Sequence, residues 1–229
     1  MHALKIFLIP EFFSFFFGFN ADFLFLFGMS LYQFAPTAIH KDNPGFVTWN
    51  DGFSDSEIEQ IKELCETLTK GKGMVGGATE TEDISAVRTS TVSWLTRTPE
   101  SEWIYDRLAF IARKLNADFY GFDLFGFVED MQYTIYDGKE QGHYDFHLDM
   151  IPPAGDNPPR KLSLVLQLSD PSKYEGGDLQ IWPGGEIRNA ERVLGGVTLF
   201  PSCLLHRVTP VTKGVRKSLV FWVGGVPYR

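Results

Sequence analysis

The spacing of apolar residues changes about halfway along the chain, from a helical period to short alternating runs. A first helix is expected to begin at Ser54, because Ser54 and Glu57 form a capping box and Phe53 precedes them as a hydrophobic staple. A second helix is expected with Thr98 as N-cap and Pro99 as its first residue. The buried stripes of the two helices are expected at Ile58, Ile61, Leu64, Cys65 and Leu68, and at Trp103, Leu108, Ile111, Ala112 and Leu115.

The segment between the two helices has two characters. Residues 72–86 are rich in Gly, Thr and acidic residues and predict an exposed loop, whereas residues 86–95 are rich in Val, Thr, Ser and Trp and predict a strand. After Tyr120 the chain consists of short apolar or alternating segments separated by Gly and Pro turns. These segments are 126–136, 143–149, 161–168, 178–182, 193–200, 204–211 and 216–223. So many short strands predict a mainly β protein with flanking helices, built as a sandwich or barrel-like pair of sheets.

Four potential metal ligands occur in one predicted strand. Alternate residues of a strand share a face, so His143, Asp145, His147 and Asp149 are expected to point the same way. Two pairs, His143-x-Asp145 and His147-x-Asp149, therefore fit the pattern His-x-Asp. We favour the second pair, because Asp149 ends the strand just before the Pro-rich stretch, where a metal at the mouth of a barrel would lie.

One histidine downstream completes a ligand set. His206 is the only histidine after this strand, and two histidines with one carboxylate are the ligands of non-haem Fe(II) oxygenases. Arg216 begins the last strand and shares a face with Ser218, Val220 and Trp222. An arginine and a nearby hydroxyl bind a carboxylate well, so Arg216 and Ser218 are candidates for holding the far carboxylate of 2-oxoglutarate. Trp222, Val220 and Leu166 are the expected pocket walls.

Composition restricts the partners. The 229-residue chain is 44% hydrophobic and 22% charged, with a formal net charge of −8, and shows no basic stripe. Duplex-DNA readers carry such a stripe, so we expect no nucleic-acid partner. The two cysteines, Cys65 and Cys203, lack zinc-site spacing and are interpreted as buried thiols in a reducing compartment, which favours a cytoplasmic location.

The first 28 residues differ from the rest, because they contain ten of the 21 phenylalanines. Pro10, Glu11, Asn20 and Asp22 interrupt any membrane-spanning helix, and no clean signal-peptide cleavage site follows. We favour a mis-called start, with the protein beginning at Met29. A membrane anchor or a secretory signal in residues 1–28 stays the alternative, and residues 29–229 are interpreted as a single domain.

In order and spacing, the motifs resemble those of the Fe(II)/2-oxoglutarate dioxygenase superfamily, in particular its prolyl 4-hydroxylase-like branch. The resemblance runs from about residue 50 to residue 226. Its motifs are Val92–Leu95, Tyr136-Asp137-Gly138, His147-Leu148-Asp149, Arg160–Ser163, Tyr174–Leu179, Phe200-Pro201-Ser202, His206–Val211 and Gly214–Ser218. It implies a double-stranded β-helix, a cupin-like jelly roll, with helices on the outer face of one sheet.

The resemblance also implies roles for individual residues. His147, Asp149 and His206 would be the catalytic iron ligands, and Arg216 would pair with the C5 carboxylate of 2-oxoglutarate with help from Ser218. Tyr136 matches a tyrosine that lines the cosubstrate pocket. Gln167 stands where some relatives have a second tyrosine for the same carboxylate, so its role is left open.

The implied activity is hydroxylation of a C–H bond with Fe(2+), 2-oxoglutarate and O2, releasing succinate and CO2, with ascorbate as a candidate reductant. A prolyl residue in a peptide or protein is the favoured substrate, and the loops at 72–86 and 151–159 would accept an extended chain. The same chemistry on a free amino acid or small metabolite is one alternative. A metal- or sugar-binding jelly roll without turnover is another, which the cosubstrate arginine argues against. The oligomeric state is left open.

Overall fold

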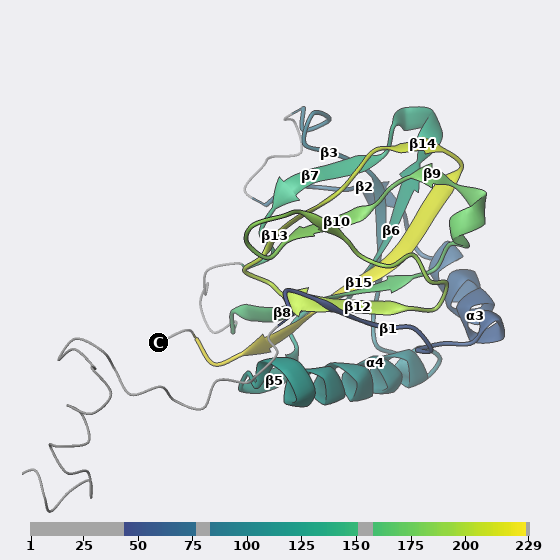
Figure 1. The fold of residues 1–229 in the computed structure, drawn as a ribbon. Coiled ribbons are helices and arrows are strands. Elements are labelled where there is room, and N and C mark those ends of the chain that lie inside the picture. Colours follow the sequence, from purple (N-terminus) through teal and green to yellow (C-terminus); the bar gives the residue numbers. More distant parts are fainter. Residues whose placement is uncertain (1–43, 77–82, 151–157, 228–229) are drawn as a thin grey trace, which may run out of the picture. The chain divides into compact units, whose positions relative to one another are not determined.

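The described part of the chain is built on two antiparallel sheets that face each other. The computed structural model describes residues 44–76, 83–150 and 158–227, so the expectations for residues 1–28, and most of those for 151–159, lie outside the described residues. Helices cover only the outer face of the larger sheet (Figure 1). This arrangement confirms the expected jelly roll with helices on one outer face. Among the described residues, no helix is long and apolar enough to cross a membrane.

The larger sheet has eight strands within the described residues. Its order is β1 (Val47–Trp49), β12 (Val197–Pro201), β8 (Arg160–Gln167), β15 (Val215–Gly225), β6 (Met131–Asp137), β4 (Thr91–Leu95) and β2 (Gly71–Lys72), with β5 (Leu124–Phe127) paired to β15. The long strand β15 therefore lies at its centre and pairs with β8, β6 and β5.

The smaller sheet has five strands in the described residues. Its order is β11 (Arg188–Asn189), β10 (Leu179–Trp182), β13 (Leu205–Val208), β7 (His143–His147) and β3 (Arg88–Thr89). A separate pair is formed by β9 (Glu175–Gly176) and β14 (Val211–Lys213). Short helical turns at Gly138–Glu140 and Pro171–Lys173 connect strands at the edge of the jelly roll.

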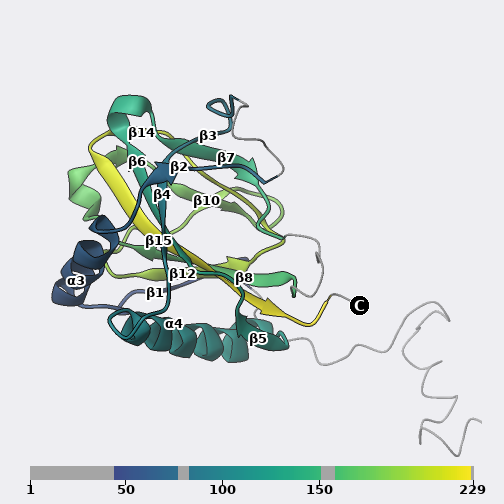
Figure 2. The same cartoon turned by 180° about the vertical axis from the view of Figure 1, so that it is seen from behind.

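Two helices close the outer face of the larger sheet, and Figure 2 shows this from behind. Helix α3 (Asp55–Glu66) begins at the expected capping box of Ser54 and Glu57, and α4 (Glu102–Leu115) continues into one π-helical turn, Asn116–Tyr120. Most residues of the two expected apolar stripes are buried against the sheet, whereas Leu64, Leu68 and Trp103 are only partly buried. The largest buried side chains of this core include Ile58, Ile61, Ile104, Leu108, Ile111, Met131, Tyr133, Leu162, Leu164, Leu166 and Phe221.

Alternation along the central strands divides the side chains between two environments. Leu219, Phe221 and Val223 of β15 join the helix-side core, as do Leu162, Leu164 and Leu166 of β8. The intervening residues face the smaller sheet. The expectation that Leu166 lines the pocket is therefore wrong. Val165, which has the opposite parity on β8, lines it instead.

The start of the second helix is a correction. The helix begins at Glu102 rather than at Pro99, because Thr98 and Ser101 first form a turn. The backbone N–H groups of Ser101 and Glu102 donate to the carbonyl of Thr98 at 3.1 and 2.9 Å. The Ser101 hydroxyl accepts from the Thr98 N–H at 2.9 Å and donates to the carbonyl of Thr96 at 2.8 Å. This local network competes with an earlier helix start.

Two of the expected strands are each divided. Residues 86–95 do not form one strand, because β3 belongs to the smaller sheet and β4 to the larger one, and the chain crosses between them at Ser90. Likewise, residues 126–136 are divided between β5 and β6. The segment 143–149 forms a strand only to His147, so that Asp149 lies just beyond its end. The end of β7 thus falls between the two candidate ligands His147 and Asp149.

Candidate active site

Three of the predicted residues converge between the sheets. The register between β7 and β13 pairs His147 with His206, and Asp149 follows two residues after His147. The Nε2 atoms of His147 and His206 lie 3.6 and 3.4 Å from the two Asp149 carboxylate oxygens. One ligand atom from each of the three residues falls within 4.8 Å of the others. This is a group that could hold one metal ion with open positions.

Backbone carbonyls orient both imidazole rings. The Nδ1 atom of His147 lies 2.8 Å from the carbonyl oxygen of Asp145, and that of His206 lies 3.0 Å from the carbonyl oxygen of Leu204. In each case the partner is two residues upstream, so Nδ1 carries the hydrogen that this bond needs. Both Nε2 lone pairs are then directed toward Asp149, which is the arrangement that a metal ligand requires.

Two buried serines hold the carboxylate of Asp149. The Ser163 hydroxyl donates to Asp149 Oδ2 at 2.8 Å and lies 2.9 Å from the Ser202 hydroxyl. The backbone of Asp149 is fixed to the same place, because its N–H donates to the Ser202 carbonyl at 3.1 Å. Ser163 and Ser202 stand in motifs of the predicted family, but no role could be assigned to them from the sequence alone.

The three side chains shift one another's pKa values, and the shifts of His147 and Asp149 favour metal binding whereas that of His206 opposes it. Burial, followed by the charge of His206, lowers the pKa of His147 to about 4. Burial alone would raise the pKa of Asp149, but the charge and hydrogen bond of His206 outweigh it and hold that pKa below its usual range. Burial opposes the charged form of His206, yet the Asp149 carboxylate raises its pKa. A metal ion needs ionised carboxylate and neutral imidazoles, so it would displace the proton from His206.

The first His-x-Asp pair lies elsewhere, for a reason that the sequence did not reveal. A register shift between β7 and β13 pairs Val208 with Tyr144 and His206 with His147, so β7 contains a bulge between Tyr144 and His147. Strict alternation is broken, and the expectation that all four potential ligands share one face is wrong. Asp145 is exposed, and the His143 ring instead contacts the carbonyls of Gln141 and Ala86 at 2.9 and 3.4 Å.

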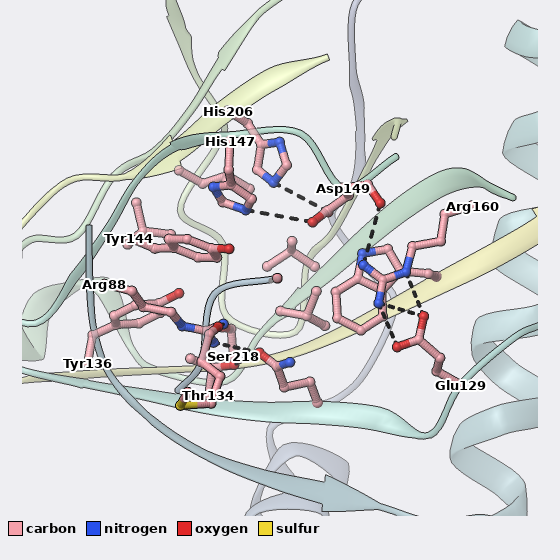
Figure 3. Close-up of a pocket in the computed structure, with 18 of the residues that line it drawn as sticks. Arg88, Glu129, Thr134, Tyr136, Tyr144, His147, Asp149, Arg160, His206 and Ser218 are labelled. Atoms are coloured by element: carbon pink, nitrogen blue, oxygen red, sulfur yellow. Dashed lines mark hydrogen bonds and ion pairs between the residues drawn. The ribbon is translucent and has the colours of Figure 1, made fainter. Parts of the chain in front are cut away.

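The bulge brings Tyr144 into the site. Its ring stacks on that of His147, with centroids 3.6 Å apart and planes 14° apart (Figure 3). Tyr144, His147, Asp149 and His206 all line one cavity of about 280 Å³. Its other walls are the inner faces of β6, β8 and β15, together with Leu179 and Val208 of the smaller sheet. The expected walls Trp222 and Val220 are confirmed.

One side of the cavity is built for an anion. Arg216 and Ser218 line it and are 3% and 1% exposed, and the Arg216 guanidinium lies 5.6 Å from the ring of Tyr136, its partner on β6. In the part of the chain that the structure describes, no carboxylate lies within ion-pair distance of Arg216, and the buried Ser218 hydroxyl has no hydrogen-bond partner. Burial raises the pKa of Tyr136, which keeps its hydroxyl protonated. A buried cation beside an unsatisfied hydroxyl fits a ligand carboxylate.

Gln167, whose role the sequence left open, contacts other residues of the protein. Its side-chain amide donates to the Tyr174 hydroxyl at 2.8 Å and to the Ser169 carbonyl at 3.0 Å. Gln167 and Tyr174 border a small hollow that also touches Arg216, but neither lines the main cavity. Gln167 is therefore positioned behind Arg216, and contact with a cosubstrate stays a prediction.

Five further cavity residues carry charge or a polar group that sequence reasoning did not assign to the site: Arg88, Glu129, Gln132, Thr134 and Arg160. Arg160 forms a two-pronged ion pair with Glu129 at 2.6 and 2.5 Å and lies 3.7 Å from the centre of the Trp222 ring. The sequence did contain a sign that Arg88 has a special role, because it is the only charged residue in the predicted strand 86–95. Of the two cysteines expected to be buried, Cys65 is buried, but the expectation is wrong for Cys203, which is exposed.

Fold and site together define a jelly-roll protein with a candidate two-histidine, one-carboxylate centre beside an anion-binding pocket. Residues 131–224, which contain all seven site residues predicted from the sequence, match the family model described as the 2OG-Fe(II) oxygenase superfamily. This part of the chain is therefore similar to that superfamily, and the predicted resemblance, including its prolyl 4-hydroxylase-like branch, is confirmed. The family name itself implies iron and 2-oxoglutarate.

Individual relatives agree with this assignment. A PKHD-type hydroxylase of Acidovorax ebreus is 36% identical over 88 residues, which are 38% of this chain and 39% of the relative. The chain thus spans about 39% of the length of the curated relatives that it matches. A prolyl-4-hydroxylase structure from Pseudomonas putida has a TM-score of 0.60 at 19% identity and covers 80% of this chain and 94% of its own.

A prolyl hydroxylase from Trichoplax adhaerens, in complex with a hypoxia inducible factor peptide fragment, is a second structural neighbour. It has a TM-score of 0.63 at 16% identity, over 79% of this chain and 84% of its own. At such identities the two structures establish the shared fold.

Proposed function

We propose that this protein is an Fe(II)- and 2-oxoglutarate-dependent dioxygenase that hydroxylates a C–H bond, with a prolyl residue of a peptide or protein as its substrate. The observation that carries the proposal is the shared cavity of the His147–Asp149–His206 group and Arg216. A metal-binding module alone has no need for a buried arginine beside an unsatisfied serine hydroxyl. The similarity to prolyl hydroxylases supports the choice of substrate.

In this proposal each side chain has one task. His147, Asp149 and His206 bind Fe(II), while Arg216, Ser218 and Tyr136 bind the distal carboxylate of 2-oxoglutarate. The bound metal and cosubstrate would supply the oxidising power that inserts one atom of O2 into a C–H bond, with release of succinate and CO2. Trp222, Val220 and Val165 line the cavity and exclude water from it.

The residues around the three proposed ligands hold them in place before the metal binds. Ser163 and Ser202 fix the direction of the Asp149 carboxylate, and backbone carbonyls fix both rings, so the three ligands need little rearrangement when the metal binds. Ascorbate as reductant, and the cytoplasmic location, also belong to the proposal. The two free cysteines fit a reducing compartment.

The proposal is tested by turnover. The full chain is incubated with Fe(II), 2-oxoglutarate, O2 and a library of proline-containing peptides, and succinate formation and peptide mass are followed. The expected result is succinate formation coupled to the gain of one oxygen atom by a proline-containing peptide, and loss of both in Asp149→Ala. Succinate formation without any modified peptide would reject the peptide substrate, and no succinate with any substrate would reject the activity.

A further inference from the structure

The cavity contains a second buried guanidinium, that of Arg88 on β3, which is 5% exposed. Its Nε donates to the Ser90 hydroxyl at 2.8 Å, its Nη1 to the Met74 carbonyl at 2.8 Å and its Nη2 to the Gln132 side-chain oxygen at 2.7 Å. It also lies 4.5 Å from the centre of the Tyr144 ring. Figure 3 shows Arg88 beside Tyr144 and Tyr136 in the pocket. All of these partners are neutral.

The charge of Arg88 has no counter-ion among the side chains that the structure describes. Among the residues that the structure describes, no carboxylate lies within ion-pair distance of Arg88, whereas the nearby Arg160 is paired with Glu129. A buried charge without a counter-ion is costly, and such a charge at a functional cavity is explained when a ligand supplies the opposite charge.

The proposed metal and cosubstrate do not supply the negative charge that would balance Arg88. The two charges of Fe(II) and the one of Arg216 are balanced by the two carboxylates of 2-oxoglutarate and by Asp149. Arg160 and Glu129 of the lining neutralise each other, so the described lining with these ligands is neutral without Arg88, and Arg88 adds one positive charge. The remaining ligand of the reaction is the substrate.

We propose that Arg88 is a specificity-determining residue that binds a carboxylate of the substrate. This inference rests on the proposed function and narrows it to a substrate with an acidic group near the reacting carbon. The position of Arg88 in the cavity supports this role, because Arg88 contacts Tyr144, and Tyr144 stacks on the proposed iron ligand His147. The three hydrogen bonds also fix the guanidinium before binding, which lowers the entropic cost of recognition.

The acid could belong to a free amino acid or to an acidic residue next to a proline in a peptide. Both present the same carboxylate, and a planar guanidinium suits either. A proline between neutral neighbours offers no such group and would leave Arg88 without a counter-ion. Probes that differ only in this charge therefore separate the possibilities.

The test uses two matched pairs of probes. The full chain is loaded with Mn(II) and 2-oxoglutarate under anaerobic conditions, and binding is measured by calorimetry. The first pair is L-proline and L-prolinamide. The second is an acetylated, amidated peptide with Pro-Glu and its Pro-Gln counterpart. We expect at least one acid to bind roughly 10-fold or more tightly than its amide, the effect of a charge-assisted hydrogen bond. The pair that shows the preference identifies the source of the acid.

Three variants assign the preference to Arg88. Arg88→Gln is expected to abolish it, and Arg88→Lys to retain part of it, because lysine keeps the charge but not the planar fork. Gln132→Glu leaves Arg88 in place and gives it an internal counter-ion through the existing contact, so it is also expected to abolish the preference. This last variant keeps the test decisive if Arg88→Gln fails to fold.

Several results would overturn the inference. They are equal binding of acid and amide in both pairs, no binding of either acid, a preference that survives both Arg88→Gln and Gln132→Glu, and a loss of 2-oxoglutarate affinity in Arg88→Gln as large as in Arg216→Ala. The last would assign Arg88 to the cosubstrate. Failure of the proposed function looks different, because 2-oxoglutarate would then not bind to the Mn(II)-loaded wild type at all.

Discussion

His147 and His206 face each other across β7 and β13, with their Cα atoms paired in the strand register and their ring centroids 4.1 Å apart. Backbone pairing therefore sets two of the three proposed iron ligands. The third, Asp149, lies beyond the end of β7 and depends on Ser163 and Ser202 for its position. The serines are thus expected to matter most for metal affinity outside the ligands themselves.

Removal of the Ser163 hydroxyl is expected to weaken metal binding. In Ser163→Ala the Asp149 carboxylate loses its 2.8 Å hydrogen bond, and loss of such an outer partner lowers metal affinity roughly 10- to 100-fold. Calorimetric titration with Mn(II) measures the change. Ser93→Ala is the matched control, because Ser93 is an equally buried serine of β4 outside the cavity lining. Equal affinities in wild type and Ser163→Ala would contradict the positioning role.

Arg216→Ala is expected to lower 2-oxoglutarate affinity roughly 10- to 150-fold, because a charge-assisted pair in a buried site is lost. Titration of the Mn(II)-loaded protein with 2-oxoglutarate measures it. Arg207→Ala serves as the control, since Arg207 follows His206 on β13 but binds Gln180 outside the cavity lining. An affinity that stays at the wild-type level in Arg216→Ala would remove this residue from the cosubstrate site.

The two cysteines are expected to react at different rates. Burial raises the pKa of the Cys65 thiol to about 12, whereas Cys203 lies exposed in the turn between β12 and β13. The thiolate is the reactive form, so a thiol reagent added to the native protein should label Cys203 and leave Cys65 unmodified. Peptide mapping of the labelled protein checks this, with Cys203→Ser as the control. Rapid labelling in Cys203→Ser would show that Cys65 is accessible.

Glu66 connects α3 to the larger sheet, and its removal is expected to lower stability in a pH-dependent way. Hydrogen bonds from Lys217, Lys70 and Tyr133 lower the pKa of Glu66 from 4.5 to about 2. A depressed pKa means that the stabilisation is complete above the unfolded value and is lost as the pH falls toward the folded one. The side chain is 37% exposed, so solvent screening limits the effect of Glu66→Gln to about 1 kcal/mol.

Denaturant unfolding of Glu66→Gln at about pH 7 and about pH 3 measures this difference. The loss in the free energy of unfolding is expected to be larger at the higher pH. Glu63→Gln makes the same charge change on the exposed side of α3, and its effect should stay below about 0.5 kcal/mol. A larger loss at the lower pH would contradict the pKa shift.

Much of the fold followed from local rules, because capping and alternation act over a few residues. The capping box of Ser54 and Glu57, the four inward residues of β15 and the jelly-roll arrangement were predicted correctly. The start of α4 was wrong, because the hydroxyl of Ser101 holds a turn around Thr98 that the N-cap rule does not anticipate. The expectation for Leu166 was wrong, because the sequence does not show which face of β8 lines the pocket.

The site was predictable only as far as it depends on residue type. The chemistry of the site could be predicted from the residue types and spacing of His147, Asp149, His206 and Arg216. The bulge that turns Tyr144 inward could not, because it arises from the pairing of β7 with β13. Arg88 was missed for a similar reason. The strand around it divides between two sheets, and only the tertiary structure shows that its partners are all neutral.

The central claim is that His147, Asp149 and His206 bind Fe(II) and leave room for 2-oxoglutarate. It is tested most directly by anaerobic addition of Fe(II) and 2-oxoglutarate, read as the charge-transfer absorbance of the chelate. Wild type and Asp145→Ala are expected to show the band, because Asp145 is exposed and belongs neither to the three-residue group nor to the cavity lining. Asp149→Ala is expected to lose it. A wild type without the band, or an Asp149→Ala variant that retains it at full strength, would contradict the account.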